Sequence, residues 1–442
     1  MKKLASIYLV ASASLFAPAA AQEAAPLPES DVDAAAGGAE SLGETLLISE
    51  PIQDGAALIA AEPVSLDHSV ENDHRGSWRV VPQLSAKGTY DDNIFIQREN
   101  RVADYIFALS PGVAFGFWDS DYERERYLER RRGTALLDRT RGDFLVVQYT
   151  ALLLGFVRTP SQNTLDHDAR LSARWQREKL TLGATVLLES KSETNTEVGD
   201  RIRRKSATAE VTSTYQLTEK IAAGLALSNN VNDPENYART VDWRAESSLD
   251  YSATPLVRFG FGAVVGKVQV QGGTEHVFQR LLARTTYSLS EKLEAEFRGG
   301  VEFRQSSGPV ADRTSPIFEV RLAWLPVVGT HVGLEAFRRV NTSIEDAGRN
   351  IIVNGGAITV RRDLRGGVYF DAAAGFEVAN YSSDAGAEQR DDRYWFVRPG
   401  IWYNFAPWAS AGVTYEHRRN ASTRRDSSFV NNQVSVEITL TY

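Results

Sequence analysis

The last ten residues, QVSVEITLTY (433–442), alternate strictly between polar and apolar side chains. The apolar set comprises Val434, Val436, Ile438, Leu440 and Tyr442. The polar set comprises Gln433, Ser435, Glu437, Thr439 and Thr441. Because successive side chains of a β-strand point to opposite faces, this pattern predicts a strand with one apolar and one polar face.

The same alternation recurs upstream as far as Trp78 and predicts an all-β chain. The predicted strands run about a dozen residues, which exceeds the usual five or six of a globular sheet and suits a strand tilted across a bilayer. Short turns alternate with longer polar loops, which is the layout of an outer-membrane barrel. The strands are expected at 78–91, 102–118, 144–158, 167–177, 180–191, 204–217, 220–231, 238–252, 255–270, 276–289, 292–305, 314–325, 329–341, 351–363, 366–381, 393–405, 408–420 and 430–442.

We therefore predict a transmembrane antiparallel up-and-down β-barrel of about 18 strands, with sixteen as the alternative count. An even number of strands puts both chain ends on one side, which is the periplasmic side for a secreted chain. The competing fold is a soluble β-sandwich, whose strands are usually shorter and less uniform. Aromatic residues near the predicted strand ends fit interfacial girdles: Trp78, Tyr90, Trp118, Tyr215, Tyr251, Trp324, Trp395, Phe405, Trp408 and Tyr442.

Composition excludes several classes of protein. The 442 residues include 49 Lys plus Arg, 57 Asp plus Glu and no Cys, for a formal net charge of −8. The absence of Cys excludes disulfide scaffolds, Cys-ligated zinc, iron–sulfur clusters, a thiol nucleophile and a lipidated N-terminal Cys. The acidic total argues against nucleic-acid binding, which needs a basic surface. The charge is uneven, with −11 over 22–77 and +1 over 78–442.

Two segments differ from the alternating region. Residues 1–21 combine Lys2 and Lys3 with an apolar stretch and a small-residue cleavage site, which is typical of a secretory signal peptide. Residues 22–77 have one-signed charge and low hydrophobicity, and we expect a disordered acidic periplasmic leader. It is either a solvated linker or a tail that binds a partner or enters the pore. The barrel would then span 78–442, interrupted by a charged periplasmic insertion at 119–143, which either docks a partner or is a solvated loop.

A barrel with an apolar outer face places the polar set of each strand in the lumen. The lumen-lining candidates are Arg170, Arg174, Asp242, Arg244, Arg280, Arg284, Glu296, Arg298 and Arg321. Their mixed signs allow two interpretations: an ion-pair lattice that stiffens the wall, or a charged track for a polar or anionic solute. Arginine suits both, because its planar fork pairs with carboxylates and stacks on rings.

Catalytic patterns are weak, and we expect no enzyme, no catalytic residue, no cofactor and no metal site. The six histidines form no HExxH motif, and neither a GxSxG elbow nor a phosphate-binding glycine loop is present. Ser161, Asn163, Asp166 and His167 resemble a hydrolase set. They fall in one predicted loop, however, so closeness in sequence implies no triad geometry.

Two nearby stretches carry a family resemblance. Gly88 to Phe95 (GTYDDNIF) is followed by Asp104 to Phe107 (DYIF) and by Ser110 to Gly112 (SPG). This pairing resembles the putative β-barrel porin type 2 family of Gram-negative outer membranes. The resemblance implies an outer-membrane barrel of about eighteen strands, frequently associated with exopolysaccharide or capsule export. Asp91, Asp92 and Asn93 would lie at the first external loop, either as a tight turn or as a sugar- or ion-binding motif.

Together these patterns predict a multi-pass barrel of the cell outer membrane, and the family resemblance implies that it serves as a conduit for exopolysaccharide or capsule export. The alternatives are a general diffusion porin for small polar solutes and a structural barrel with a plugged lumen. Expected partners are outer-membrane lipid, lipopolysaccharide and a periplasmic polysaccharide-export protein, with no nucleic acid.

Overall fold

A computed structural model of the chain describes residues 77–118, 143–272, 275–290, 292–307, 311–345, 349–381, 389–406 and 408–441. Within these ranges, eighteen antiparallel β-strands form one sheet. Their bounds are β1 Ser77–Asp91, β2 Asp104–Trp118, β3 Phe144–Phe156, β4 Thr164–Arg177, β5 Leu180–Asn195, β6 Asp200–Gln216, β7 Ile221–Pro234, β8 Thr240–Thr254, β9 Val257–Val270, β10 Glu275–Ser290, β11 Leu293–Ser306, β12 Arg313–Trp324, β13 Thr330–Thr342, β14 Asn350–Asp363, β15 Val368–Tyr381, β16 Arg390–Ala406, β17 Ala409–Ser422 and β18 Phe429–Thr441.

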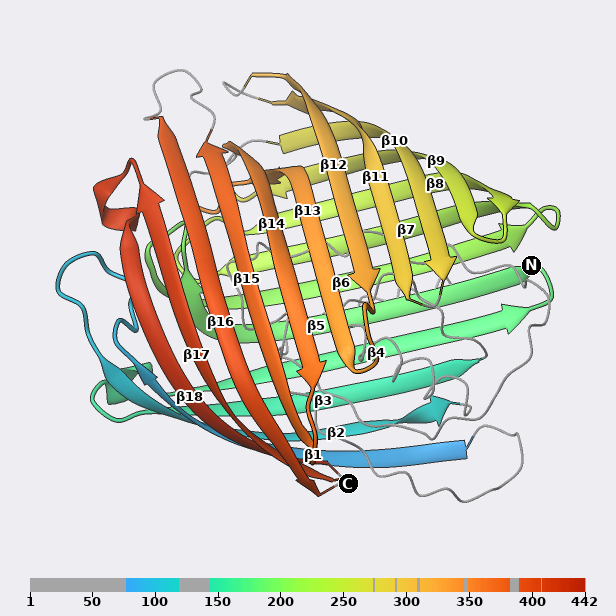
Figure 1. The fold of residues 1–442 in the computed structure, drawn as a ribbon. Coiled ribbons are helices and arrows are strands. Elements are labelled where there is room, and N and C mark those ends of the chain that lie inside the picture. Colours follow the sequence, from blue (N-terminus) through green and yellow to red (C-terminus); the bar gives the residue numbers. More distant parts are fainter. Residues whose placement is uncertain are drawn as a thin grey trace, which may run out of the picture.

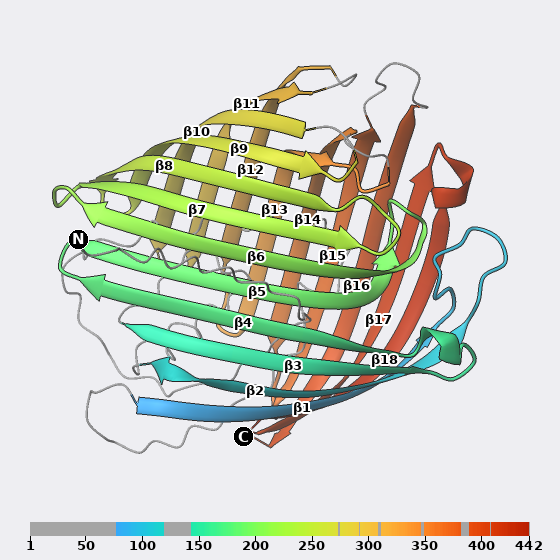
Figure 2. The same cartoon turned by 180° about the vertical axis from the view of Figure 1, so that it is seen from behind.

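The sheet closes on itself into a barrel (Figures 1 and 2). Each strand pairs with its neighbours in sequence, and β1 also pairs with β18, from Gln83 opposite Thr441 to Asp91 opposite Gln433. Closure gives every strand a neighbour on both sides, as strands in lipid require. The predicted barrel of about eighteen strands is confirmed.

Each strand presents one face outward and the other toward the lumen. On β9, for example, Phe259, Phe261 and Val265 are exposed, whereas Val264 and Val268 are buried on the inner face. On β18 the exposed residues are Val434, Val436 and Ile438, as the alternation predicts. An apolar outer face is favourable in lipid and costly in water, at about 25 cal/mol per Å² of apolar surface. The barrel is therefore built for a bilayer.

The connections between strands differ in length at the two ends of the barrel. Short turns at one end, which we call the turn end, join β4 to β5, β6 to β7 and the equivalent later pairs. Apart from the segment between β2 and β3, which is at the turn end, the longer connections lie at the other end, the loop end, and include two short 3₁₀ helices, Pro160–Gln162 and Arg425–Ser427. In outer-membrane barrels the short turns are periplasmic and the long loops extracellular.

The aromatic girdle residues lie where the sequence predicts. Eight of the ten expose their side chains on the outer face: Trp78, Tyr90, Tyr215, Tyr251, Trp324, Trp395, Phe405 and Trp408. The side chains of Trp118 and Tyr442 lie outside the described residues. No helix in the described part of the chain is both long enough and apolar enough to cross a membrane.

The largest differences from the predicted strands occur at β5 and β6. The segment 192–203 was expected to be a loop, but the hairpin stays paired as far as Asn195 opposite Asp200. Most of the polar residues in 192–203 therefore belong to strands, and only 196–199 form the turn. The expected signal peptide, most of the acidic leader and residues 119–142 of the insertion lie outside the described residues.

Candidate functional site

The nine lumen-lining candidates all belong to the inward-facing set of their strands. Seven of them lie on β8, β10, β11 and β12, in one sector of the wall. Arg170 and Arg174 lie on β4, which is separated from that sector by β5 to β7. Arg174, Asp242, Arg280, Glu296 and Arg298 are buried, and Arg170, Arg244, Arg284 and Arg321 are partly buried. The alternation is what places them together, because every second residue of a strand shares a face.

Most of these arginines pair with a carboxylate on the same strand, on the adjacent strand or, for Arg284, two strands away. Arg244 pairs with Asp242, two residues away on β8. Arg284 Nη2 lies 2.6 Å from Asp250 Oδ1, Arg298 Nη2 lies 3.3 Å from Glu296 Oε1, and Arg321 Nη2 lies 2.6 Å from Glu319 Oε1. This geometry favours the ion-pair lattice for the individual side chains.

A shared carboxylate makes the tightest part of this lattice. Glu302, which is 1% exposed, accepts from Arg280 Nε at 2.6 Å and from Arg304 Nε at 2.7 Å. Removing one partner of a buried pair is costly, typically 3–5 kcal/mol, because it leaves a buried charge uncompensated. The predicted lumen-lining residues include Arg280 but neither Glu302 nor Arg304, although both share the inward parity of Arg298 on β11.

Three guanidinium groups gather around Phe278, whose side chain is fully buried on the inner face of β10. The Cζ atoms of Arg244, Arg280 and Arg304 lie 5.6, 4.7 and 5.2 Å from the ring centroid, within the range of cation–π attraction. The ring fits because its partner across the strand pair is Gly266, where a Cβ would overlap it. Glycine in this strand therefore serves close packing, one of the roles expected of a strand glycine.

The inner face is not polar throughout at the loop end of β13 to β18. There the inner face carries a buried apolar cluster: Phe337, Ile351, Val353, Ala373, Ala379, Tyr381, Tyr394, Phe396 and Phe429. Ile96, from the β1–β2 loop, also packs in this cluster, with a positive φ of 47° that a β-branched residue rarely adopts. The loop therefore folds inward, and its isoleucine fills space inside the barrel.

The β5–β6 hairpin crosses the loop end of the barrel. Its strands extend beyond their neighbours, because β4 pairs with β5 only as far as Ser190 and β7 pairs with β6 only from Arg204. The five residues beyond Ser190 span ~15 Å. The tip, Thr196–Gly199, reaches the β13–β14 loop, which belongs to the opposite side of the eighteen-strand ring (Figures 1 and 2).

Glu197 fixes this crossing. Its carboxylate accepts from the Ser343 hydroxyl, from the Glu345 backbone N–H at 3.2 Å and from the Ile344 backbone N–H at 3.5 Å. Glu345 in turn pairs with Arg390 at 3.0 Å and with Arg424 at 2.5 Å. One carboxylate thus ties two loops together across the mouth, and a charged network on β16 and the β17–β18 loop supports it.

Other strands also hold the hairpin. Arg390 Nη2 donates to the Thr196 carbonyl at 3.5 Å, and Arg418 Nη1 donates to Thr194 Oγ1 at 3.2 Å. Burial raises the pKa of Glu197 above its usual value, and this effect outweighs the hydrogen bonds that lower it. No motif in the sequence marks Glu197, since only the folded hairpin brings residue 197 to residues 343–345.

The Asp91–Asp92–Asn93 motif lies on the seam where the barrel closes. Asp91 Oδ2 accepts from Gln433 Nε2 at 2.9 Å, and Asp92 accepts from the backbone and side-chain nitrogens of Asn432 at 2.7 and 2.6 Å. Asn93 Nδ2 donates to the Gln97 and Val430 carbonyls. These contacts join β1 to β18 at the loop end, so the geometry favours the structural interpretation of the motif.

The weak hydrolase set does not assemble. Asp166 and His167 both belong to β4, where adjacent residues face opposite sides of the wall. Asp166 is buried on the inner face. On the outer face, His167 Nδ1 and the Tyr149 hydroxyl form a hydrogen bond of 2.8 Å. No cluster of three or more potential metal-ligating side chains occurs among the described residues.

One protein-family model agrees with this fold. The protein-family model "Putative beta-barrel porin 2" matches residues 279–442, so the resemblance noted in the sequence is confirmed over that part of the chain. No curated protein matches. Among solved structures, the chain is similar to the outer membrane protein OpdK of Pseudomonas aeruginosa, with 10% identity, a TM-score of 0.43, and coverage of 82% of this chain and 99% of that one.

A second similar structure is OccAB4 of Acinetobacter baumannii, with 10% identity, a TM-score of 0.44, and coverage of 84% of this chain and all of the other. The P. aeruginosa protein OccK2, solved in complex with glucuronate, gives 10% identity and a TM-score of 0.44 over 82% of this chain and 98% of that one. The family match over residues 279–442 and the closed barrel make the chain similar to outer-membrane β-barrels of the porin type.

Proposed function

We propose that this porin-type barrel is a channel for small polar solutes, with a preference for anions, and that the β5–β6 hairpin covers its extracellular mouth. The observation that carries the proposal is the Glu197 contact with residues 343–345 on the opposite side of the ring. A mouth crossed in this way limits the size of a solute. It also gives the channel a part whose displacement would change conductance.

The preference for anions rests on the arginines of the inner wall. Arg244, Arg280 and Arg304 surround Phe278, and Arg298 and Arg339 lie near them. Each guanidinium has five N–H donors. Asp242 and Glu302 take only some of those of Arg244 and Arg280, which leaves others for a passing anion. A neighbouring carboxylate lowers the net charge without removing these donors.

Polysaccharide export, which the family resemblance implies, is the alternative. It requires the hairpin to swing clear of the β13–β14 loop, because a hydrated chain of sugars is wider than a small solute. General diffusion and a plugged lumen are the remaining alternatives, and they differ from the proposal in selectivity and in conductance respectively.

The purified barrel in a planar bilayer tests the proposal. We expect step-like conductance and, in a KCl gradient, a reversal potential of the sign that Cl⁻ preference gives. Replacing Arg298 with Gln should move this potential toward zero. Absence of conductance would support a plugged barrel, and an unselective conductance would support a diffusion porin.

A deletion strain tests the export alternative separately. The proposal predicts unchanged secreted polysaccharide and slower uptake of a small anionic solute. Loss of secreted polysaccharide, restored by the wild-type chain but not by one with the hairpin tied shut, would replace the proposal with export.

A further inference from the structure

The barrel wall is incomplete between β12 and β13 at the loop end. These strands pair from Trp324 opposite Val332 to Phe318 opposite Arg338, and no further. Yet β12 continues to Arg313 and β13 continues to Thr342, so several residues of each strand face one another without a ladder. The strands on either side stay paired, since Arg313 still pairs with β11 and Thr342 with β14.

Pro316 explains where the ladder stops. Extending the register beyond Phe318 and Arg338 would place Pro316 opposite Val340, and proline has no N–H to donate. Proline also interrupts two other ladders, at Pro111 between β2 and β3 and at Pro399 between β16 and β17. There the pairing is lost over two residues and then resumes. Pro316 lies only three residues from the start of β12, so few pairs remain beyond it to restore the ladder.

Arginine side chains take the place of the missing backbone partners. Arg338 Nε donates to the Pro316 carbonyl at 3.1 Å, and Arg304 Nη2 donates to the Val340 carbonyl at 3.4 Å. Arg338 also donates to Asn354 Oδ1 at 2.6 Å. A buried carbonyl left unpaired is costly, so these bonds allow the opening to persist.

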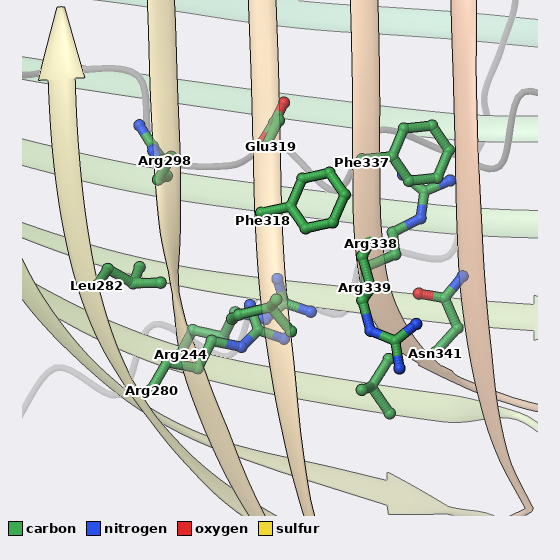
Figure 3. Close-up of a pocket in the computed structure, with 12 residues that line it drawn as sticks. Arg244, Arg280, Leu282, Arg298, Phe318, Glu319, Phe337, Arg338, Arg339 and Asn341 are labelled. Carbon is green, nitrogen blue, oxygen red and sulfur yellow. The ribbon is translucent and has the colours of Figure 1, made fainter.

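A cavity of about 70 Å³ lies at this opening, and residues from both faces of the wall line it. Arg244, Arg280 and Arg298 come from the inner face, whereas Phe318 is exposed on the outer face. Figure 3 shows Phe318 on β12 and Arg338 and Arg339 on β13, on the two sides of the cavity. A site lined from both faces lies between the lumen and the outer face.

The lining has the character of a site for an anion that carries an apolar chain. Five arginines and one carboxylate, Glu319, line it, together with Leu282, Ile317, Phe318, Phe337 and Val340. The volume holds on the order of five water molecules, which suits a carboxylate or phosphate head but not a whole lipid. An attached chain would have to leave the cavity, and the route past Phe318 leads to the apolar outer face.

We propose that the opening between β12 and β13 is a lateral binding site for a single-chain anionic amphiphile. The head lies among the arginines, and the alkyl chain passes Phe318 into the outer leaflet. This site is additional to the channel along the barrel axis and does not depend on whether that channel conducts.

Decanoate is a suitable probe, titrated calorimetrically into the purified barrel in a nonionic detergent and corrected against micelles alone. We expect saturable binding that is at least tenfold tighter than that of acetate, which has the head alone, or of decanol, which has the chain alone. Arg338→Gln should weaken decanoate binding about tenfold, and Phe318→Ala should weaken decanoate but not acetate. The Pro399→Val variant is the matched control, because its proline interrupts a ladder elsewhere, and it should bind as the wild type does.

Closing the opening gives the decisive comparison. The chain has no Cys, so Ser315→Cys combined with Asn341→Cys introduces one pair at positions that would face each other in a continued ladder. We expect the oxidised form to lose decanoate binding and dithiothreitol to restore it. Pro316→Val, which supplies the missing N–H, should weaken binding in the same direction without a disulfide.

Two results would overturn the site. Equal decanoate affinity in the oxidised pair, in Pro316→Val and in the wild type would show that the opening is not used. Equal affinity for acetate and decanoate would reduce the site to one for small free anions. Because bilayer conductance is measured independently, either result leaves the channel proposal intact.

Discussion

Glu197 joins the two sides of the barrel mouth through one buried carboxylate. Burial disfavours the charged form, so the pKa of this group in the docked hairpin is raised above its usual value. A raised pKa in the docked state means that docking is favoured when the group is protonated and is weakened as pH rises through that pKa. Arg390, Glu345, Asp392 and Tyr381 are the charged and titratable groups around it.

We predict that the mouth opens more often as pH rises. The open fraction in single-channel recordings between pH 5 and pH 8 should increase with pH. The Glu197→Gln variant keeps the shape of the side chain but cannot ionise, so its open fraction should stay flat. A wild-type open fraction that decreases as pH rises would contradict the prediction.

The seam contacts of Asp91 give a second prediction at this scale. Asp91→Ala removes the acceptor of the Gln433 side-chain amide and of the Asn93 backbone N–H, at a cost of about 1–3 kcal/mol. The temperature at which the folded band disappears on heated gels should fall. Glu99→Ala removes an exposed pair with Arg425 and should leave that temperature unchanged. An equal fall in this temperature for the two variants would show that the seam contacts stabilise the barrel no more than an exposed ion pair does.

At the scale of elements, the β5–β6 hairpin shows how strand length creates a functional part. β5 has 16 residues and β6 has 17, and their ends have no neighbouring strand to hold them in the wall. Paired only with each other, they can bend inward and contact β13–β14 and β16–β18. The hairpin is therefore a mouth cover made from the same strands that form the wall.

Shortening this hairpin tests its role. Replacing residues 194–201 with Asn-Gly joins Glu193 to Ile202, which are already paired, through a turn that suits a two-residue hairpin. We expect larger single-channel conductance and a loss of pH dependence, with unchanged heat resistance of the barrel. Unchanged conductance would mean that the narrowest point lies elsewhere.

At the scale of the whole molecule, stability depends on the apolar outer face as much as on the lumen. Leu281, near the middle of β10, is 61% exposed on that face. We predict that Leu281→Arg costs about 2–4 kcal/mol in a bilayer, as expected for a charge near the midplane. Reversible unfolding in lipid vesicles measures this cost. Leu281→Val keeps the face apolar and should change stability much less, and a tolerated arginine would place Leu281 away from lipid.

The sequence predicted the barrel well because membrane strands must alternate and must be long enough to cross. All eighteen predicted strands correspond to β1–β18, with differences only at their ends. Lumen-lining residues such as Arg280 and Arg298 followed from parity alone. Their ion-pair partners were harder to predict. The register between β10 and β11 places Glu302 opposite Arg280, and the residues beside Glu302 in the sequence do not indicate this pairing.

The sequence by itself determined the strand count, the outward apolar face and the inward parity of the arginines, because each depends on residues two positions apart. Only the tertiary structure decided the rest. It brought Glu197 to Ser343, placed Ile96 inside the lumen and left β12 apart from β13 beyond Pro316. The contacts of Glu197 and Ile96 join residues that are far apart in the sequence, so no local pattern encodes them. The gap beyond Pro316 depends on the register between β12 and β13.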